Sequence, residues 1–262
     1  MTDTRQVVVV TGGTRGVGAG IARSFLTAGA RVVVCARRPP ERPVEAVGAT
    51  AEFRPLDVRD AAAAHAVLAR VAADHGSVDA LVNNAGGTPH ASLTGTDPAR
   101  QAKIVELNLL APLYASLAAY EVMRAQGSGG SITMIGSVSG ARPSPGSAAY
   151  GAAKAGLDSL ARTMAVEWAP AVRVNTVVLG LARTESAHVH YGDAAGVARV
   201  ARTVPLGRLA EPADVGDACV FLASDRAAYI SGASLQLHGG GERPAFLDAA
   251  STDRTTHGGA AT

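Results

Sequence analysis

The sequence predicts a doubly wound α/β fold, in which a parallel sheet of seven strands carries helices on both faces. Short apolar runs alternate along the chain with helix-like stretches, which implies βαβ crossovers. Uninterrupted apolar runs are typical of strands buried on both faces. The seven runs cover residues 7–10, 31–35, 53–57, 80–83, 131–135, 172–178 and 234–237.

Helices are expected between these runs, at residues 19–28, 61–74, 101–126 and 150–168. No linker divides the chain, so residues 1–262 are expected to form a single domain with a core from about 6 to 241. Residues 185–204 are interpreted as a variable lid over the substrate. The stretch 243–262 is expected to be a partly flexible tail, because residues 251–262 are small and polar.

Composition excludes several classes of protein. Of the 262 residues, 47% are hydrophobic and 18% are charged, which argues against a disordered chain. A formal net charge of +2 gives no electrostatic reason to expect nucleic acid or an acidic membrane as partner. No uninterrupted apolar run approaches the ~18–20 residues of a membrane span, and no secretory signal is visible. A cytoplasmic protein is therefore expected.

The cysteines and histidines suggest no metal site. Cys35 and Cys219 lie far apart in apolar surroundings and are interpreted as two buried thiols. His188 and His190 have only Asp193 as a nearby further ligand, which is too few for a metal.

A glycine-rich loop follows the first predicted strand and opens the first helix. Its glycines have the spacing G-x₃-G-x-G, and glycine there permits a tight turn and close approach of the backbone to a pyrophosphate. The free N–H groups of the helix N-terminus then favour phosphate. The loop predicts a Rossmann-type nucleotide site formed by Gly12, Thr14, Arg15, Gly16, Val17 and Gly18.

The end of the second predicted strand indicates which dinucleotide binds. A carboxylate at this place would bind the ribose 2′-OH of NAD(H), but the sequence has Ala36 there, followed by Arg37. Together with Arg15, Arg37 would match the oxygens of a 2′-phosphate. NADP(H) is therefore expected rather than NAD(H). The alternative is that Arg37 and Arg38 are solvated loop charges.

Tyr150 and Lys154 are spaced to share one face of a helix. A phenol has a pKa of about 10, and a neighbouring ammonium would lower it enough for proton transfer near neutrality. Ser137 follows the fifth apolar run, where strand ends open into a cleft. A surface pair of tyrosine and lysine is the alternative interpretation.

Taken in order, these motifs resemble the short-chain dehydrogenase/reductase family, in its compact single-domain branch that includes 3-oxoacyl-ACP reductases. The resemblance rests on the glycine loop, on Asn108, and on Ser137 with Tyr150 and Lys154. It also rests on the segment Asn83-Asn84-Ala85-Gly86, and it extends from about residue 6 to residue 241.

The resemblance implies a role for each matching residue. Tyr150 is implied to exchange a proton with the substrate oxygen, Ser137 to hydrogen-bond that oxygen, and Lys154 to hold the nicotinamide ribose. Asn108 is implied to organise a water that links Lys154 to solvent. Further cofactor contacts are implied for Asp57, Val58, Asn84, Ala85, Gly86, Gly180, Ala182 and Thr184.

The sequence departs from the family pattern in two places. Leu179 replaces a proline, so the following loop is expected to be looser, and His238 replaces an aspartate. Neither change removes one of the four implied catalytic residues.

The expected function is an NADPH-dependent ketoreductase or alcohol dehydrogenase that acts on a small carbonyl or alcohol substrate. An epimerase or dehydratase that uses the nucleotide transiently, and a non-catalytic NADP sensor, are the alternatives. Arg142 and Arg183 near the cleft suggest an anionic or acyl-carrier substrate. A homotetramer or homodimer is expected, because small residues on the long helices permit close helix contact.

Overall fold

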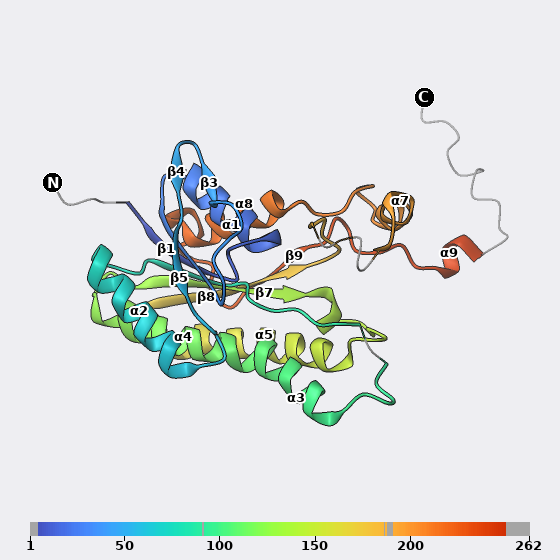
Figure 1. Cartoon of the computed structure of the whole chain (residues 1–262), viewed down its shortest axis with the longest axis horizontal. Helices are drawn as coiled ribbons and strands as arrows, with labels where there is room; N and C mark the ends of the chain where they lie inside the picture. Colours follow the sequence, from blue (N-terminus) through green and yellow to red (C-terminus); the bar gives the residue numbers. More distant parts are fainter. Residues whose placement is uncertain (1–4, 91, 186, 188–190, 250–262) are drawn as a thin grey trace.

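The fold is built on a seven-stranded sheet with the order β5-β2-β1-β6-β7-β8-β9 (Figure 1). It is described from a computed structural model that covers residues 5–90, 92–185, 187 and 191–249. All six strand pairs of this sheet are parallel. The predicted fold class is confirmed. The strands are β1 (Val7–Thr11), β2 (Arg31–Ala36), β5 (Glu52–Pro55), β6 (Ala80–Asn83), β7 (Gly130–Ser137), β8 (Val172–Leu179) and β9 (Ser234–Leu237).

Helices cover both faces of the sheet. On one face, α1 packs closely against α8; on the other, α2 packs against α4, and α5 lies over β7 and β8 (Figure 1). The helices are α1 (Gly16–Thr27), α2 (Ala61–His75), α3 (Pro98–Val105), α4 (Ala111–Ala125), α5 (Ala148–Glu167), α7 (Ala194–Thr203), α8 (Pro212–Ala223) and α9 (Phe246–Ala249).

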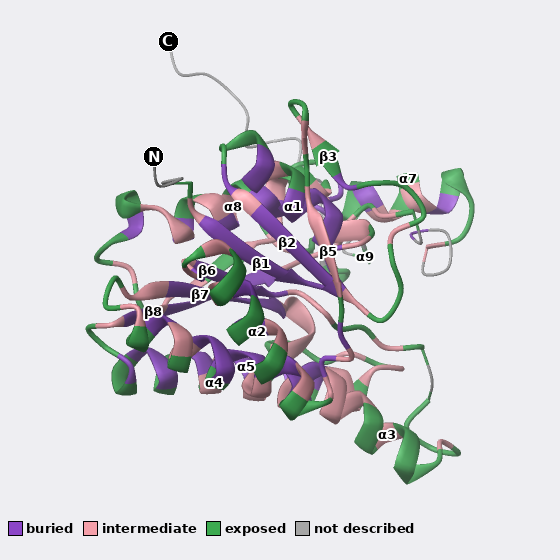
Figure 2. Cartoon of the chain, turned by 60° about the vertical axis from the view of Figure 1, so that its left-hand side comes forward, coloured by how far each residue is buried: buried purple, intermediate pink, exposed green. Residues whose placement is uncertain are grey.

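The central strands separate two apolar cores. Successive side chains of a strand point to opposite faces. In β1, Val7 and Val9 therefore belong to the core under α2, α4 and α5, whereas Val8 and Val10 belong to the core under α1 and α8. All five residues of β1 are buried, which explains why this strand reads as an uninterrupted apolar run (Figure 2).

The strand order reverses between β1 and β6. From β1 the chain builds outward through β2 and β5 on one side, and from β6 through β7, β8 and β9 on the other. In an open parallel sheet, ligands bind outside the carboxyl ends of the strands at such a reversal. The topology therefore places a binding crevice beside the ends of β1 and β6.

The predicted helix 101–126 is interrupted by a π-helical turn. Five residues, Glu106–Leu110, separate α3 from α4, and this turn contains the fully buried Asn108. By length and composition alone, the run from Pro98 to Ala125 could cross a membrane. It supplies Ala111, Ala115 and Met123 to the core, so the fold accounts for its apolar character without a membrane.

Several elements were not predicted, among them the short helix α9. A two-stranded hairpin pairs β3 (Glu45–Ala46) with β4 (Ala49–Thr50). Helix α7 lies within the stretch interpreted as a lid. Helix α8 starts with a capping box between Glu211 and Asp214 and with Pro212 in its first turn, a signal that the sequence already contained.

The chain after β9 is described as far as Ala249. In this part of the chain, the Arg243 N–H donates to the Thr203 carbonyl at 2.9 Å. The predicted small polar tail, residues 251–262, lies outside the described residues, as do His188 and His190.

Candidate active site

A cleft of about 510 Å³ opens at the strand reversal. It lies between the glycine loop, the ends of β2 and β6, and the segment that follows β5. Most of the predicted cofactor residues line it, namely Gly12, Thr14, Arg15, Gly16, Val17, Gly18, Arg37, Asp57, Val58, Asn84, Ala85, Gly86 and Thr184.

Two glycines of the loop are required by close contacts. A Cβ atom on Gly12 would lie 2.9 Å from the Ala85 Cα, and one on Gly18 would lie 2.2 Å from the Gly12 carbonyl oxygen. Gly12 also has a φ of +65°, which L side chains rarely adopt. The N-terminus of α1 can therefore approach the cleft with its backbone N–H groups unobstructed by side chains.

Thr11 joins the glycine loop to the end of β6. Its buried hydroxyl donates to the Val82 carbonyl at 3.3 Å and accepts from the backbone N–H groups of Asn84 and Ala85, both at 3.1 Å. The Asn84 amide donates in turn to the carbonyls of Thr11 and Gly12, at 3.0 and 3.2 Å. These bonds fix the position of the glycine loop, one wall of the cleft, relative to the segment after β6, another wall.

Asn83 has a different role from its neighbours. It is buried, and its side-chain amide donates to the Ser116 hydroxyl at 2.8 Å and thus ties β6 to α4. The predicted segment 83–86 is therefore divided: Asn83 stabilises the sheet, and the next three residues line the cleft.

Three arginines face the outer part of the cleft. Arg15 and Arg37 were predicted there, and the structure adds Arg59. Arg59 binds both carboxylate oxygens of Asp57, at 2.5 and 3.0 Å, and this contact is the main reason that the pKa of Asp57 is lowered to about 2. Arg59 was not predicted from the sequence, because its place in the cleft depends on a side chain that folds back onto Asp57, two positions earlier.

The three residues of the reactive set meet at the end of β7. Ser137 is the last residue of β7, and its hydroxyl is hydrogen-bonded to that of Tyr150 in the first turn of α5. The Lys154 ammonium lies 5.6 Å from the centre of the Tyr150 ring and donates to the Ile135 carbonyl at 2.8 Å. The spacing predicted from the sequence therefore places these side chains together.

Burial dominates the titration of both ionisable groups. It raises the pKa of Tyr150, and the hydrogen bond with Ser137 offsets part of that rise. It lowers the pKa of Lys154 from its ordinary 10.5 to about 8. The expected lowering of the Tyr150 pKa by Lys154 is not seen in this structure, where burial has the largest effect on the phenol and Ser137 the next.

Asn108 connects the reactive set to the cleft. Its side-chain oxygen accepts from the Gly87 N–H, and its amide donates to the carbonyls of Gly87 and Ile104, all at 2.9 Å. A Cβ atom on Gly86, a cleft residue, would lie 2.7 Å from the Asn108 Oδ1 and 3.5 Å from the Lys154 Nζ. Lys154 does not line the cleft itself, but its ammonium lies beside Gly86, which does.

The loop after β8 is held firmly, contrary to expectation. Leu179, in place of the family's proline, pairs in register with Leu237. The Gly180 N–H donates to the Leu237 carbonyl at 3.0 Å, and Ala182 forms a bridge with Ala210. Gly180 and Ala182 do not line the cleft, whereas Thr184 and the unpredicted Glu185 do.

Comparison with known proteins is consistent with this geometry. A family profile described as enoyl-(acyl carrier protein) reductase matches residues 12–242. The chain belongs to the short-chain dehydrogenase/reductase family. Its members are oxidoreductases that use nicotinamide cofactors, so the coarse activity of the chain is established.

Individual relatives cover almost the whole chain. It is 35% identical over 243 residues to the 3α-hydroxysteroid dehydrogenase of Mediterraneibacter gnavus, covering 89% of this chain and 96% of that one. It is 36% identical over 240 residues to the 3-oxoacyl-[acyl-carrier-protein] reductase of Escherichia coli, covering 90% and 96%. A crystal structure of a variant actinorhodin polyketide ketoreductase with NADPH superimposes with a TM-score of 0.83 at 29% identity, covering 92% and 98%.

Because Lys154 is buried as a cation, its replacement by methionine should stabilise the folded chain. Below pH 8 the Lys154 ammonium is charged in both the folded and the unfolded state. The lowering of its pKa from 10.5 to about 8 on folding then corresponds to about 3 kcal/mol of destabilisation of the folded chain. As the pH rises from 8 to 10.5, the folded chain releases the proton first and regains that stability. Lys154→Met should therefore raise the free energy of unfolding at pH 7, by less than this amount because the bond to Ile135 is lost, and the gain should disappear near pH 10.5.

Urea unfolding at several pH values measures this difference. Lys103→Met is the matched control, since Lys103 is exposed on α3. A Lys154→Met effect that does not change between pH 7 and pH 10.5 would contradict the assignment.

Proposed function

We propose that the chain is an NADP(H)-dependent carbonyl reductase that transfers a hydride between nicotinamide and a ketone or secondary alcohol. The observation that carries the proposal is the convergence of Ser137, Tyr150 and Lys154, with the Lys154 ammonium beside Gly86 in the wall of a nucleotide-sized cleft. The relatives named above support it, since they are dehydrogenases and reductases.

The residues of the cleft fit a nicotinamide dinucleotide. A volume of about 510 Å³ is within the ordinary range of ligand sites. The N-terminus of α1 would hold the pyrophosphate. Arg15 and Arg37 would bind the 2′-phosphate, and the absence of a carboxylate at Ala36 removes the group that would select NAD(H).

In the proposed reaction the bound dinucleotide supplies the hydride to the carbonyl carbon. Tyr150 gives its phenolic proton to the carbonyl oxygen and becomes a phenolate; in the oxidative direction it takes the proton from the alcohol. Ser137, already hydrogen-bonded to Tyr150, donates to the same oxygen and stabilises the charge that develops on it. Lys154 would hold the nicotinamide ribose and stabilise the phenolate.

Asn108 is proposed to bind a water molecule through its backbone carbonyl. The residue four positions later is Pro112, which has no N–H, so this carbonyl lacks its α-helical donor. The side chain cannot serve as well, because both of its polar atoms are bonded to Gly87. A water at the carbonyl would return the proton to Tyr150 by way of Lys154.

We expect Tyr150→Phe to lower kcat by about 100-fold or more, because a positioned general acid contributes on this scale. NADPH affinity should stay nearly unchanged, since the phenol oxygen is the only group removed. NADPH oxidation with a panel of ketones measures kcat. Tyr229→Phe, at a fully exposed position, is the control; equal kcat values for all three proteins would refute the role of Tyr150.

Arg37→Ala should weaken NADPH binding by about tenfold or more, the effect of losing a charge-assisted hydrogen bond to phosphate. NADH binding should change little, because NADH has no 2′-phosphate. Fluorescence titration with both nucleotides measures this. The exposed Arg38, which does not line the cleft, provides the control variant Arg38→Ala; tighter binding of NADH than of NADPH by the native chain would disprove the NADP(H) assignment.

We further propose that the protein acts in the cytoplasm as a homodimer or homotetramer. Leu117 on α4 and Val166 on α5 are 45% and 80% exposed, and α5 also exposes the small residues Ala152 and Ala155. A second copy of the same helices would cover this face. Light scattering at micromolar concentration should give two or four times 26.3 kDa, and a mass of 26.3 kDa would contradict the assembly.

A further inference from the structure

The segment after β9 continues beyond the edge of the sheet at which Ser137 ends β7. It turns at three glycines, Gly239, Gly240 and Gly241, with φ values of +64°, +93° and +88°. The Gly239 carbonyl accepts from Leu206 at 3.1 Å, just after the end of α7. Figure 1 shows α7 and this segment beyond the same end of the sheet as the arrowhead of β7.

The next residue, Glu242, reaches a loop a hundred positions earlier in the chain. Its Oε1 lies 2.5 Å from the Nη2 of Arg142. Arg142 belongs to the loop that joins Ser137 to Tyr150, and its backbone N–H donates to the Val138 carbonyl at 3.2 Å. The ion pair therefore connects the C-terminal segment to the loop that carries the reactive groups at its two ends.

Tyr191 shows that the ion pair lies within electrostatic reach of the reactive site. Burial raises the pKa of Tyr191, and the charges of Glu242 and Arg142 act on it, as does Tyr150. Tyr191 packs with Val197 and Val200 of α7 beside the small core around Leu209. Tyr191 therefore packs beside α7 and interacts electrostatically with both residues of the ion pair and with Tyr150.

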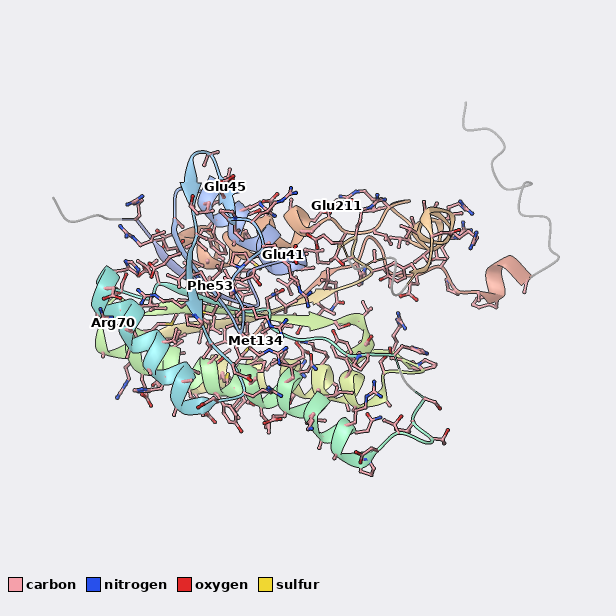
Figure 3. All side chains as sticks on the ribbon, viewed as in Figure 1. Glu41, Glu45, Phe53, Arg70, Met134 and Glu211 are labelled. Atoms are coloured by element: carbon pink, nitrogen blue, oxygen red, sulfur yellow. The ribbon has the colours of Figure 1, made fainter. Side chains whose placement is uncertain are left out.

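Arg183, the other arginine that suggested an anionic substrate, is directed elsewhere. Its Nε lies 3.1 Å from the carboxylate of Glu211 at the start of α8. Glu211, which Figure 3 labels, lies on the opposite side of the sheet from α5. Arg142, by contrast, acts electrostatically on Tyr191, on which Tyr150 also acts.

The ion pair of Arg142 and Glu242 is exchangeable. Its side chains are 39% and 36% exposed. Exposed ion pairs contribute only about 0–1 kcal/mol, so another carboxylate can replace Glu242 at little cost. A guanidinium binds an incoming carboxylate through two parallel hydrogen bonds.

We propose that Arg142 anchors a carboxylate of the carbonyl substrate, and that Glu242 occupies this anchor in the free protein. The inference rests on the proposed function, because it assigns a substrate class to the same site. The substrate is then a keto acid or hydroxy acid whose carboxylate is remote from the reacting carbon. Glu242 acts as an internal competitor that leaves when the substrate binds.

The test uses methyl ketones with a terminal carboxylate, from 4-oxopentanoate to 7-oxooctanoate, each beside its primary amide. The series varies the distance between carbonyl and carboxylate, and the amides remove only the charge. Binding is measured by calorimetry with and without NADP⁺, and turnover by NADPH oxidation. The proteins are the native chain, Arg142→Gln, Glu242→Gln and the control Arg183→Gln.

At the best chain length, Arg142→Gln should lower the affinity and kcat/KM for the acid by about tenfold or more. Glu242→Gln should raise both by about threefold or more, because the competitor is removed. The amides should respond to neither substitution, and Arg183→Gln should match the native chain. Effects of opposite sign at the two ends of one ion pair cannot arise from a purely structural contact.

The outcomes separate the anchor from the proposed function. If both variants lose affinity for acids and amides alike, the pair is a structural tie and the anchor is overturned. Reduction of every ketone with no preference for acid over amide also overturns it and leaves the reductase intact. If no ketone oxidises NADPH but the two variants still shift acid affinity in opposite directions, the anchor stands and the proposed function fails.

Discussion

The hydroxyl of Thr11 forms the contact on which the architecture of the site depends. It accepts two backbone N–H groups from the end of β6 while donating to the strand itself, so the ends of β1 and β6 stay joined beyond their last paired residues. The parallel pairing of β1 with β6 provides no hydrogen bonds at this point, because the segments that follow the two strands diverge toward different helices. The bonds of Asn84 back to Thr11 and Gly12 complete the junction. The walls of the cleft, and the approach of the α1 N-terminus to it, follow from this junction.

A buried cation, the Lys154 ammonium, lies near the same edge of the sheet. Lys154 is 4% exposed, and its ammonium donates a hydrogen bond to the Ile135 carbonyl. Such burial is unfavourable in the free protein and becomes useful when hydroxyl groups of a ligand surround the ammonium. Under the proposed function, the site gives up stability to hold a preorganised donor for a bound nucleotide, the pattern expected where binding energy supports chemistry.

Around α7 and the C-terminal segment the molecule is held together by weaker, exposed contacts. The C-terminal segment is tied to Thr203 and Leu206 beside α7, and through Glu242 to the loop between Ser137 and Tyr150. Few apolar side chains support these ties, since the core under α7 contains only Ala201, Val204 and Leu209 as buried residues in the described part of the chain. This side can rearrange at low cost, whereas the nucleotide side is built on buried strands.

Local sequence determined the features that depend on short-range periodicity. Uninterrupted valine runs marked β1 and β2 because both faces of those strands are buried, and the spacing of Tyr150 and Lys154 put both on one helical face. Neither the π-helical turn that contains the buried Asn108 nor helix α8 was predicted, although the capping residues of α8 are present in the sequence. Only the tertiary structure decided the pKa of Tyr150, the pairing of Asp57 with Arg59 and the meeting of Arg142 with Glu242. Burial, side-chain direction and contacts across a hundred residues arise from packing, and no local pattern encodes them.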